Sequence, residues 1–326
     1  MFSIIQLKLS LSLNKNIALQ YSRNLYLLSS ALYHYPIVRY RSNDVELWNP
    51  IHKQWFKNRP EERIRLRVIE YFLQECQLSP NKIGSEFTVD LANQTKGRID
   101  LVCFDANYQA HCLVECKQVY VPLNEQVAQQ IAKYNLSLPS PYLLITNGRV
   151  DAWFQRTSRG IEYLESLPDE YKSIREVDRD LPYWVDRGFV YPYIPDSLHE
   201  LVRNICSRLY VDLQSPPIYL DFEDIPTEFM LENYYLITSF GENETHTRIA
   251  FAMNGKRNTQ SLDVILSENG VSTKLLKIDM LALYNHESAH AALYTEMGQQ
   301  QVDVSSMSPL DNEEWMGKLS AFLAKA

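Results

Sequence analysis

The chain has 326 residues, of which 45% are hydrophobic and 22% are charged, and its formal net charge is −8. This length is enough for two domains with separate cores, and the composition is that of an ordinary globular protein. No stretch approaches the ~18–20 apolar residues of a membrane span, so we expect no membrane partner.

The negative charge is unevenly distributed along the chain. Residues 212–326 hold 7 Lys and Arg against 17 Asp and Glu, which leaves 25 against 23 for residues 1–211. An acidic total therefore does not exclude a nucleic-acid partner. Residues 51–70 carry a local excess of cations, and we expect three of them to contact a phosphate backbone: Lys53, Arg63 and Arg67. A solvated helix face is the alternative for each.

Residues 1–44 are expected to form an N-terminal extension. Residues 5–13 alternate apolar with polar, which is typical of a strand, whereas a signal peptide needs an uninterrupted apolar core. Five cysteines without a C-x2-C pair indicate buried, reduced thiols in a cytoplasmic protein.

Residues 45–158 predict a compact α/β domain with a mixed sheet. A small hairpin at 45–57 precedes a helix that begins at Pro60, where the missing N–H is tolerated. The remaining expected elements are strands at 87–91, 98–104 and 111–118, a helix after Pro122 that carries Gln130 and Tyr134, and strands at 142–147 and 150–155. The order is helix, three strands, helix, two strands.

The strands at 98–104 and 111–118 are joined by Asp105-Ala106-Asn107, which favours a turn and an antiparallel hairpin. Side chains alternate along a strand, so Glu115 and Lys117 project from one face. Charged groups in an apolar strand are costly without partners. We interpret Asp100 and Glu115 as ligands of one or two Mg²⁺ ions, with Lys117 beside them. A structural Glu115–Lys117 ion pair is the alternative.

Residues 45–155 resemble the PD-(D/E)xK nuclease domain, and most closely the stand-alone relatives of the N-terminal nuclease domain of type I restriction motor subunits. The matching segments are 48–55 (WNPIHKQW), 60–65 (PEERIR), 97–100 (GRID), 113–117 (LVECK), 130–134 (QIAKY) and 142–148 (YLLITNG).

The resemblance implies a hydrolase that cleaves phosphodiester bonds with Mg²⁺ or Mn²⁺, with DNA as the expected substrate, in restriction or anti-phage defence. It implies metal ligation by Asp100, Glu115 and the backbone carbonyl of Cys116. Lys117, Gln130 and Tyr134 would complete the catalytic set. A helical acid also belongs to this set, and it is Glu61 or Glu62, of which we favour Glu62. No Gly-rich phosphate loop is present, so the ATP-driven motor is missing.

The second half of the chain has no family resemblance. Residues 159–215 are expected to be a connector that includes a helix at 196–212. The composition of residues 216–326 is acidic. A mostly β domain is predicted there, with strands at 218–222, 234–240, 248–253 and 262–267. This domain is where we expect a second copy of the chain or a partner protein to bind.

A competing motif lies in the C-terminal region. His286-Glu287-Ser288-Ala289-His290 is an H-E-x-x-H sequence, which on a helix would hold Zn²⁺ through both histidines with Glu287 as general base. The same residues could form a turn between strands at 279–284 and 290–297, and Asp311, Glu313 and Glu314 are third-ligand candidates without a motif.

The fold class that we expect is therefore α/β (α+β), with a restriction-endonuclease-like core of a mixed central sheet flanked by helices. The predicted function is a metal-dependent endonuclease. The alternatives are a zinc metallopeptidase that uses residues 286–290, and a nucleic-acid-binding module without activity.

Overall fold

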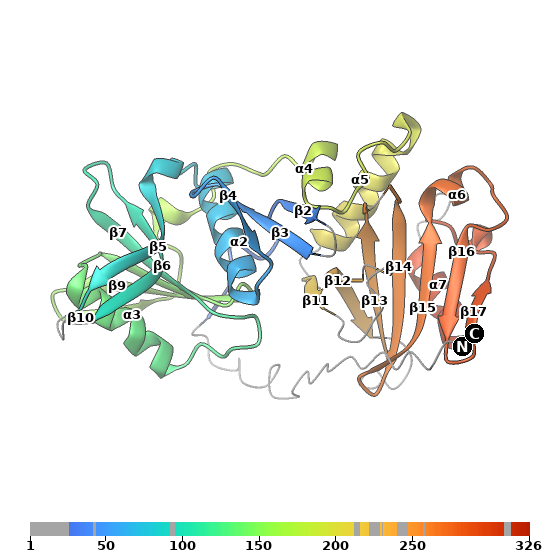
Figure 1. The fold of residues 1–326 in the computed structure, drawn as a ribbon. Helices are drawn as coiled ribbons and strands as arrows, with labels where there is room; N and C mark the ends of the chain where they lie inside the picture. The colour runs from blue at the N-terminus through green and yellow to red at the C-terminus, as the bar shows by residue number, and fades with distance from the viewer. Residues whose placement is uncertain are drawn as a thin grey trace. The chain divides into compact units, whose positions relative to one another are not determined.

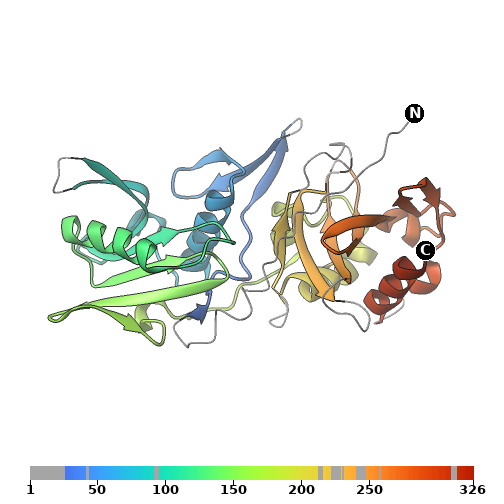
Figure 2. The same ribbon diagram turned by 90° about the horizontal axis from the view of Figure 1, so that it is seen from below.

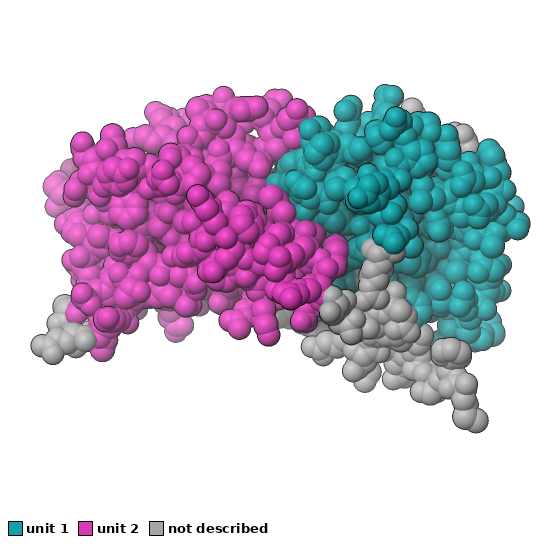
Figure 3. Space-filling view, turned by 45° about the horizontal axis from the view of Figure 1, so that its top comes forward, with its two compact units in different colours: residues 1–14, 179–326 teal, residues 15–178 magenta. Residues whose placement is uncertain are grey.

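The structure is a computed structural model that describes residues 26–41, 44–91, 95–211, 216–221, 229, 231–239, 247–256, 258–309 and 314–326. The described residues up to Asp178 form one compact unit, the N-terminal unit, and those from Arg179 onward form the C-terminal unit (Figure 3). The strand expected at 5–13 lies outside the described residues. No described helix is long and apolar enough to cross a membrane.

The N-terminal unit is built on a mixed sheet (Figure 1). Its strands, in spatial order, are β1 (Leu27–Leu28), β9 (Val150–Thr157), β8 (Tyr142–Thr146), β7 (Ala110–Cys116), β6 (Lys96–Phe104) and β5 (Ile83–Asp90), and β10 (Gly160–Leu164) also pairs with β9. β7 and β8 run parallel, and the other described pairs of this sheet are antiparallel. A helix connects β7 to β8, as a parallel crossover requires.

Two helices cover the two faces of this sheet (Figures 1 and 2). α2 (Pro60–Gln74) packs Ile64, Val68 and Phe72 into one core cluster. α3 (Glu125–Ser137) packs Val127 and Ile131 into the other. The predicted order of elements is confirmed, and so is the α+β class with a mixed central sheet flanked by helices.

Local sequence explains where these elements begin. Pro60 is the first residue of α2, and two glutamates follow in its first turn. The side chain of Asn124 caps α3 by accepting a hydrogen bond from the Val127 N–H at 3.2 Å. In the β6–β7 turn the Asp105 carboxylate accepts hydrogen bonds from two backbone N–H groups, both at 2.8 Å. The predicted hairpin is therefore present, with its turn held by the expected residue.

A separate small sheet contains β2 (Val38–Arg41), β3 (Asp44–Asn49) and β4 (Gln54–Lys57). β3 and β4 form the hairpin expected at 45–57, with Trp48 opposite Trp55. Short 3₁₀ turns occur at Pro80–Lys82 and Asp169–Tyr171.

The C-terminal unit contains an antiparallel sheet whose strands are neighbours in sequence order (Figure 1). The strands are β11 (Ile218–Leu220), β12 (Asn233–Ser239), β13 (Thr247–Asn254), β14 (Ser261–Glu268), β15 (Val271–Asp279), β16 (Ala291–Thr295) and β17 (Gly298–Gln301). The helices are α4 (Leu181–Asp186), α5 (Asp196–Tyr210), α6 (Met280–Tyr284) and α7 (Trp315–Lys325). The mostly β region that the sequence predicts is confirmed, and its sheet is antiparallel.

The stretch expected as a connector, 159–215, is divided between the units. β10 extends the N-terminal sheet, and buried Tyr171 packs against Phe72 and Trp153 in its core. α4 and α5 belong to the C-terminal unit. The apolar spacing of α5 predicted its helix, but the burial of Tyr171 depends on contacts distant in sequence.

The prediction of a strand at 279–284, one alternative for this region, is wrong, because residues 280–284 form α6. β15 ends at Asp279, whose carboxylate accepts hydrogen bonds from the N–H groups of Leu281 and Ala282 at 2.9 and 3.0 Å. This N-cap ends the strand and starts the helix.

The division into two domains remains a prediction that limited proteolysis can test. We expect trypsin to cut the native protein first at Lys172 or Arg175, because both are exposed and residues 172–180 form neither helix nor strand. Mass spectrometry should then find two stable fragments that meet in this window. Initial cleavage spread evenly over the chain would contradict the division.

Candidate active site

Asp100 and Glu115 are brought together by the register of β6 and β7. Leu101 lies opposite Val114, so Asp100 and Glu115 occupy the next antiparallel positions. Glu115 is 3% exposed. The Asp100 carboxylate accepts a hydrogen bond from the backbone N–H of Cys116 at 2.8 Å. The two predicted acids are therefore neighbours, and one is anchored to the other's strand.

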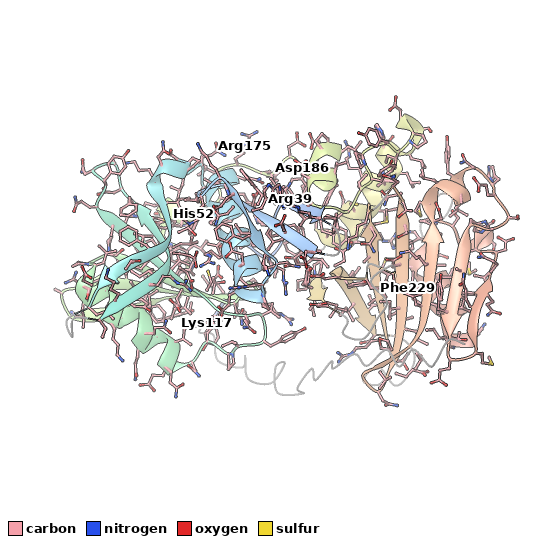
Figure 4. All side chains as sticks on the ribbon, viewed as in Figure 1. Arg39, His52, Lys117, Arg175, Asp186 and Phe229 are labelled. Carbon is pink, nitrogen blue, oxygen red and sulfur yellow. The ribbon has the colours of Figure 1, made fainter. Side chains whose placement is uncertain are left out.

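Lys117 and two residues of α3 complete a connected network around Glu115. Lys117 Nζ lies 2.6 Å from Glu115 Oε1, on the predicted face, and 3.3 Å from Gln130 Oε1. Gln130 Nε2 donates to Glu115 Oε1 at 2.8 Å and lies 3.3 Å from the Tyr134 hydroxyl. The i, i+4 spacing of Gln130 and Tyr134 puts both on the helix face that covers the strand. Lys117 is labelled in Figure 4.

Gly97 allows α3 to lie close to β6. A Cβ at this position would sit 2.7 Å from a ring carbon of Tyr134. The glycine of the Gly-Arg-Ile-Asp segment thus makes room for the aromatic ring that ends the network.

The other side of the site is formed by α2. Glu62 is buried, whereas Glu61 is exposed. Arg65 pairs with Glu62 and donates to Asp100 Oδ1 at 3.2 Å. The same guanidinium lies 3.4 Å from Glu86. The structure therefore brings Glu62, the favoured acid, into the site through Arg65.

Arg65 and Glu86 were missed by sequence reasoning. Arg65 lies among the cations of residues 51–70 and in the matching segment 60–65, but neither pattern assigns it a role, although its position one turn after Glu62 is a usable signal. Glu86 has a positive φ of 52°, which is unusual for a residue with a side chain. Ser85 pairs with Leu101 and Phe87 pairs with Ile99 in the same register, but Glu86 and Asp100 between them do not pair. The sheet is therefore irregular beside Asp100.

Burial and mutual repulsion control the charges of the site. Burial, and then the nearby charge of Asp100, raise the pKa of Glu115 to about 7. Burial also raises the pKa of Asp100. Burial alone would lower the pKa of Lys117, but its hydrogen bond with Glu115 and the acids around it raise it overall. Lys117 therefore stays protonated next to acids that resist ionisation.

Three buried carboxylate oxygens have no hydrogen-bond partner among the described residues, and two of them, Glu115 Oε2 and Glu62 Oε1, belong to this site. A buried acceptor without a partner is costly, and native structures contain few of them. Both oxygens belong to the same acid-rich site, which indicates that it is suited to an additional positively charged partner.

The three cations expected to contact nucleic acid differ in environment. Lys53 is exposed, and Arg63 is half-buried with a hydrogen bond of 2.7 Å to Asn58. Arg67 is 3% exposed, and it donates to the backbone carbonyls of residues 31, 32 and 148. The expectation for Arg67 is therefore corrected, because a guanidinium buried among carbonyls is not available to a phosphate.

The H-E-x-x-H motif does not lie on a helix. α6 ends at Tyr284, and residues 285–290 form a turn in which His286 has a φ of 58°. His286 and Glu287 are exposed, and His290 is buried. The ring of His290 bonds to the Glu287 carbonyl at 2.6 Å and accepts from the Val304 N–H at 3.1 Å. This geometry disfavours the zinc site, because the two histidines do not share a helix face.

The fold and the arrangement of acids and lysine agree with the PD-(D/E)xK nuclease-like domain that the sequence predicts. Residues 60–168 match the family model of the type I restriction enzyme R protein N terminus. The predicted resemblance is therefore confirmed for this segment, about a third of the chain, and it points to a nuclease-type role. No match to this chain was found among curated proteins or among solved structures.

The raised pKa of Glu115 predicts a pH-dependent cost to stability in the metal-free protein. A carboxyl whose folded-state pKa is about 7, instead of the usual 4.5, destabilises the fold once it ionises. The cost is absent below about pH 4.5, grows up to pH 7 and is complete above it. Glu115→Gln should therefore raise the free energy of unfolding at pH 8 by on the order of 2 kcal/mol, with little change at pH 4.5.

Urea unfolding in EDTA at pH 4.5, 6 and 8 measures this effect, with the exposed Glu176→Gln as the matched control. Equal stabilisation by Glu115→Gln at pH 4.5 and pH 8 would show that ionisation of Glu115 is not the cause.

The environment of Arg67 predicts a structural role for this residue. Arg67→Ala should lower the free energy of unfolding by about 2–4 kcal/mol, because it removes the buried guanidinium that donates to three backbone carbonyls. Arg63→Ala, one turn earlier on α2, should change it by less than about 1 kcal/mol. Urea titration of both variants distinguishes the two arginines, and equal effects would contradict the assignment.

Proposed function

We propose that this protein is a metal-dependent nuclease that hydrolyses phosphodiester bonds, with DNA as its substrate. The observation that supports this most strongly is the arrangement of Asp100, Glu115 and Lys117. Three charged groups of the predicted types lie together on or next to two neighbouring strands, and one oxygen of Glu115 has no hydrogen-bond partner among the described residues.

The donor set fits a hard divalent cation. Within the described residues no group of three or more His, Cys, Asp or Glu side chains could hold a metal ion, so the site would have to use fewer side chains. Mg²⁺ is usually held by one or two carboxylates, with water and substrate phosphate oxygens in the remaining positions. Asp100 and Glu115 would supply these carboxylates, and the backbone carbonyl of Cys116 a further oxygen. When bound, Mg²⁺ or Mn²⁺ would acidify a water molecule and offset the charge of the phosphate.

The chain's own residues have separate tasks in this proposal. Lys117 stays protonated, so its ammonium can hold the attacking water and face the phosphate oxygens. Gln130 fixes both Glu115 and Lys117 from α3, and Tyr134 in turn lies against Gln130. Arg65 and Glu62 hold Asp100 from α2. Gln130, Tyr134 and Glu62 are therefore positioning residues.

The proposed setting is restriction or anti-phage defence in the cytoplasm. The match to the restriction enzyme domain supports the role in restriction or defence. All five cysteines are free and buried, which is typical of a reducing compartment. Lys53 and Arg63 would contact the nucleic-acid backbone, and the C-terminal unit would bind a second copy or a partner protein.

The proposed chemistry predicts strict dependence on a divalent metal and on three side chains. Purified protein should convert supercoiled plasmid to nicked or linear forms with Mg²⁺ or Mn²⁺, and not with EDTA. Asp100→Ala, Glu115→Ala and Lys117→Ala should each lower the rate by at least about 100-fold, without additive effects in combination. Ca²⁺ should bind without supporting turnover, because its longer and looser coordination positions water poorly.

Metal binding separates the roles of the three residues. Isothermal titration with Mn²⁺ should show weaker binding in Asp100→Ala and Glu115→Ala, and parent-like binding in Lys117→Ala. Lys133→Ala, an exposed lysine on α3, is the matched control and should retain the parent rate. If Lys117→Ala and Asp100→Ala cut nucleic acid as fast as Lys133→Ala, the nuclease assignment is wrong.

A further inference from the structure

A cavity of about 300 Å³ lies beyond the end of β7, the strand that carries Glu115. Its walls are residues 119–124, which follow the end of β7, and residues 147–150, the turn between β8 and β9, together with Tyr26. Its volume is at the lower end of the range of ligand pockets, about 300–1,000 Å³.

The cavity is adjacent to the proposed catalytic lysine along the backbone. Cys116 pairs with Thr146 in the parallel register, and the Lys117 N–H donates to the Thr146 carbonyl at 2.8 Å. The first wall therefore begins two residues after Lys117, and the second begins one residue after Thr146.

The turn at 147–150 is held in place from several sides. Gly148 has a φ of 74°, and a Cβ there would sit 2.6 Å from Ile64 of α2. Arg67 donates to the Gly148 carbonyl at 3.1 Å. Asn147 Oδ1 accepts from the N–H groups of Arg149 and Val150 at 3.0 and 3.1 Å. This turn is thus ordered before any ligand arrives.

The two walls are also joined to each other. Asn147 Nδ2 donates to the Val121 carbonyl at 3.1 Å, and the Val121 N–H donates to the Gln118 carbonyl at 2.9 Å. The side-chain amide of Asn147 is therefore already hydrogen-bonded within the walls of the cavity. Tyr120 and Arg149 are left as the groups that can recognise a ligand.

Arg149 carries a charge that no described residue neutralises. None of the described carboxylates forms an ion pair with it, and its Nη1 is buried without a hydrogen-bond partner. The charges of Arg149 and Arg63 both act on the Tyr120 hydroxyl, against the effect of burial, which raises its pKa. This end of the cavity is therefore positive and suited to a phosphate.

The rest of the cavity is apolar and aromatic. Tyr120 is 51% exposed, so much of its side chain remains accessible. Val119, Leu123 and Val150 supply apolar surface. An aromatic ring beside a guanidinium is the combination that binds an unstacked base and its phosphate.

We propose that this cavity receives one unpaired nucleotide of the substrate strand, with its base against Tyr120 and its phosphate on Arg149. A base inside a duplex cannot enter such a cavity without leaving its stack. The protein therefore prefers single-stranded or locally unpaired nucleic acid next to the bond that it cuts. This inference rests on the proposed nuclease function.

Binding in EDTA tests the proposal apart from cleavage. Fluorescence anisotropy with a labelled 20-nucleotide single strand should show tighter binding than with the corresponding 20-base-pair duplex. Arg149→Gln and Tyr120→Leu should each weaken single-strand binding by about tenfold and duplex binding by less than about twofold. Tyr120→Phe keeps the ring and should bind like the parent, as should Arg156→Gln, an exposed arginine on β9.

A single strand with abasic sites instead of bases should bind the parent and Tyr120→Leu equally, because no base remains to stack. Circular dichroism melting of each variant shows that it is folded. The proposal is overturned if the parent does not bind the single strand more tightly than the duplex, or if folded Arg149→Gln and Tyr120→Leu bind like Arg156→Gln. If the parent protein shows the expected binding but cuts no nucleic acid with Mg²⁺, the result supports nucleotide binding in the cavity and contradicts the nuclease function.

Discussion

The site depends on one constraint, which is that Asp100 and Glu115 lie next to each other away from bulk water. Two ionised carboxylates in this position repel each other, and burial adds to the cost. Lys117 offsets the charge beside Glu115, and Arg65 offsets it beside Asp100. The remaining unfavourable charge is what makes binding of a divalent cation favourable in the proposed function.

Both helical layers are needed to hold this pair of acids. Ile99 and Leu101, on either side of Asp100, pack into different core clusters, although residues two apart in a regular strand share a face. Together with the positive φ of Glu86, this shows that the sheet departs from regularity at Asp100. Asp100 can then contact Arg65 of α2, while Glu115 contacts Gln130 of α3.

Three arginines at alternate positions of α2 illustrate how environment decides the role of one residue type. Arg63 is half-buried near the charge-sensitive Tyr120, Arg65 neutralises the acids, and Arg67 fixes the turn at Gly148. Arg65 and Arg67 are both buried, but Arg65 bonds to carboxylates whereas Arg67 bonds to backbone carbonyls. The turn that Arg67 supports is also one wall of the proposed nucleotide cavity.

The sequence by itself determined α2, α3 and strands β3 to β9 of the N-terminal unit, and it singled out the acids and the lysine of the candidate site. Apolar periodicity, Pro60, Asn124 and Asp105 act locally, and the strand alternation that places Glu115 beside Lys117 is also local. Only the tertiary structure decided that Glu62 is buried, that Arg65 reaches Asp100, and that Arg67 is buried away from solvent. It also decided that residues 286–290 form a turn. These outcomes depend on how a helix is rotated against the core and on contacts between residues far apart in the chain, which no local pattern specifies.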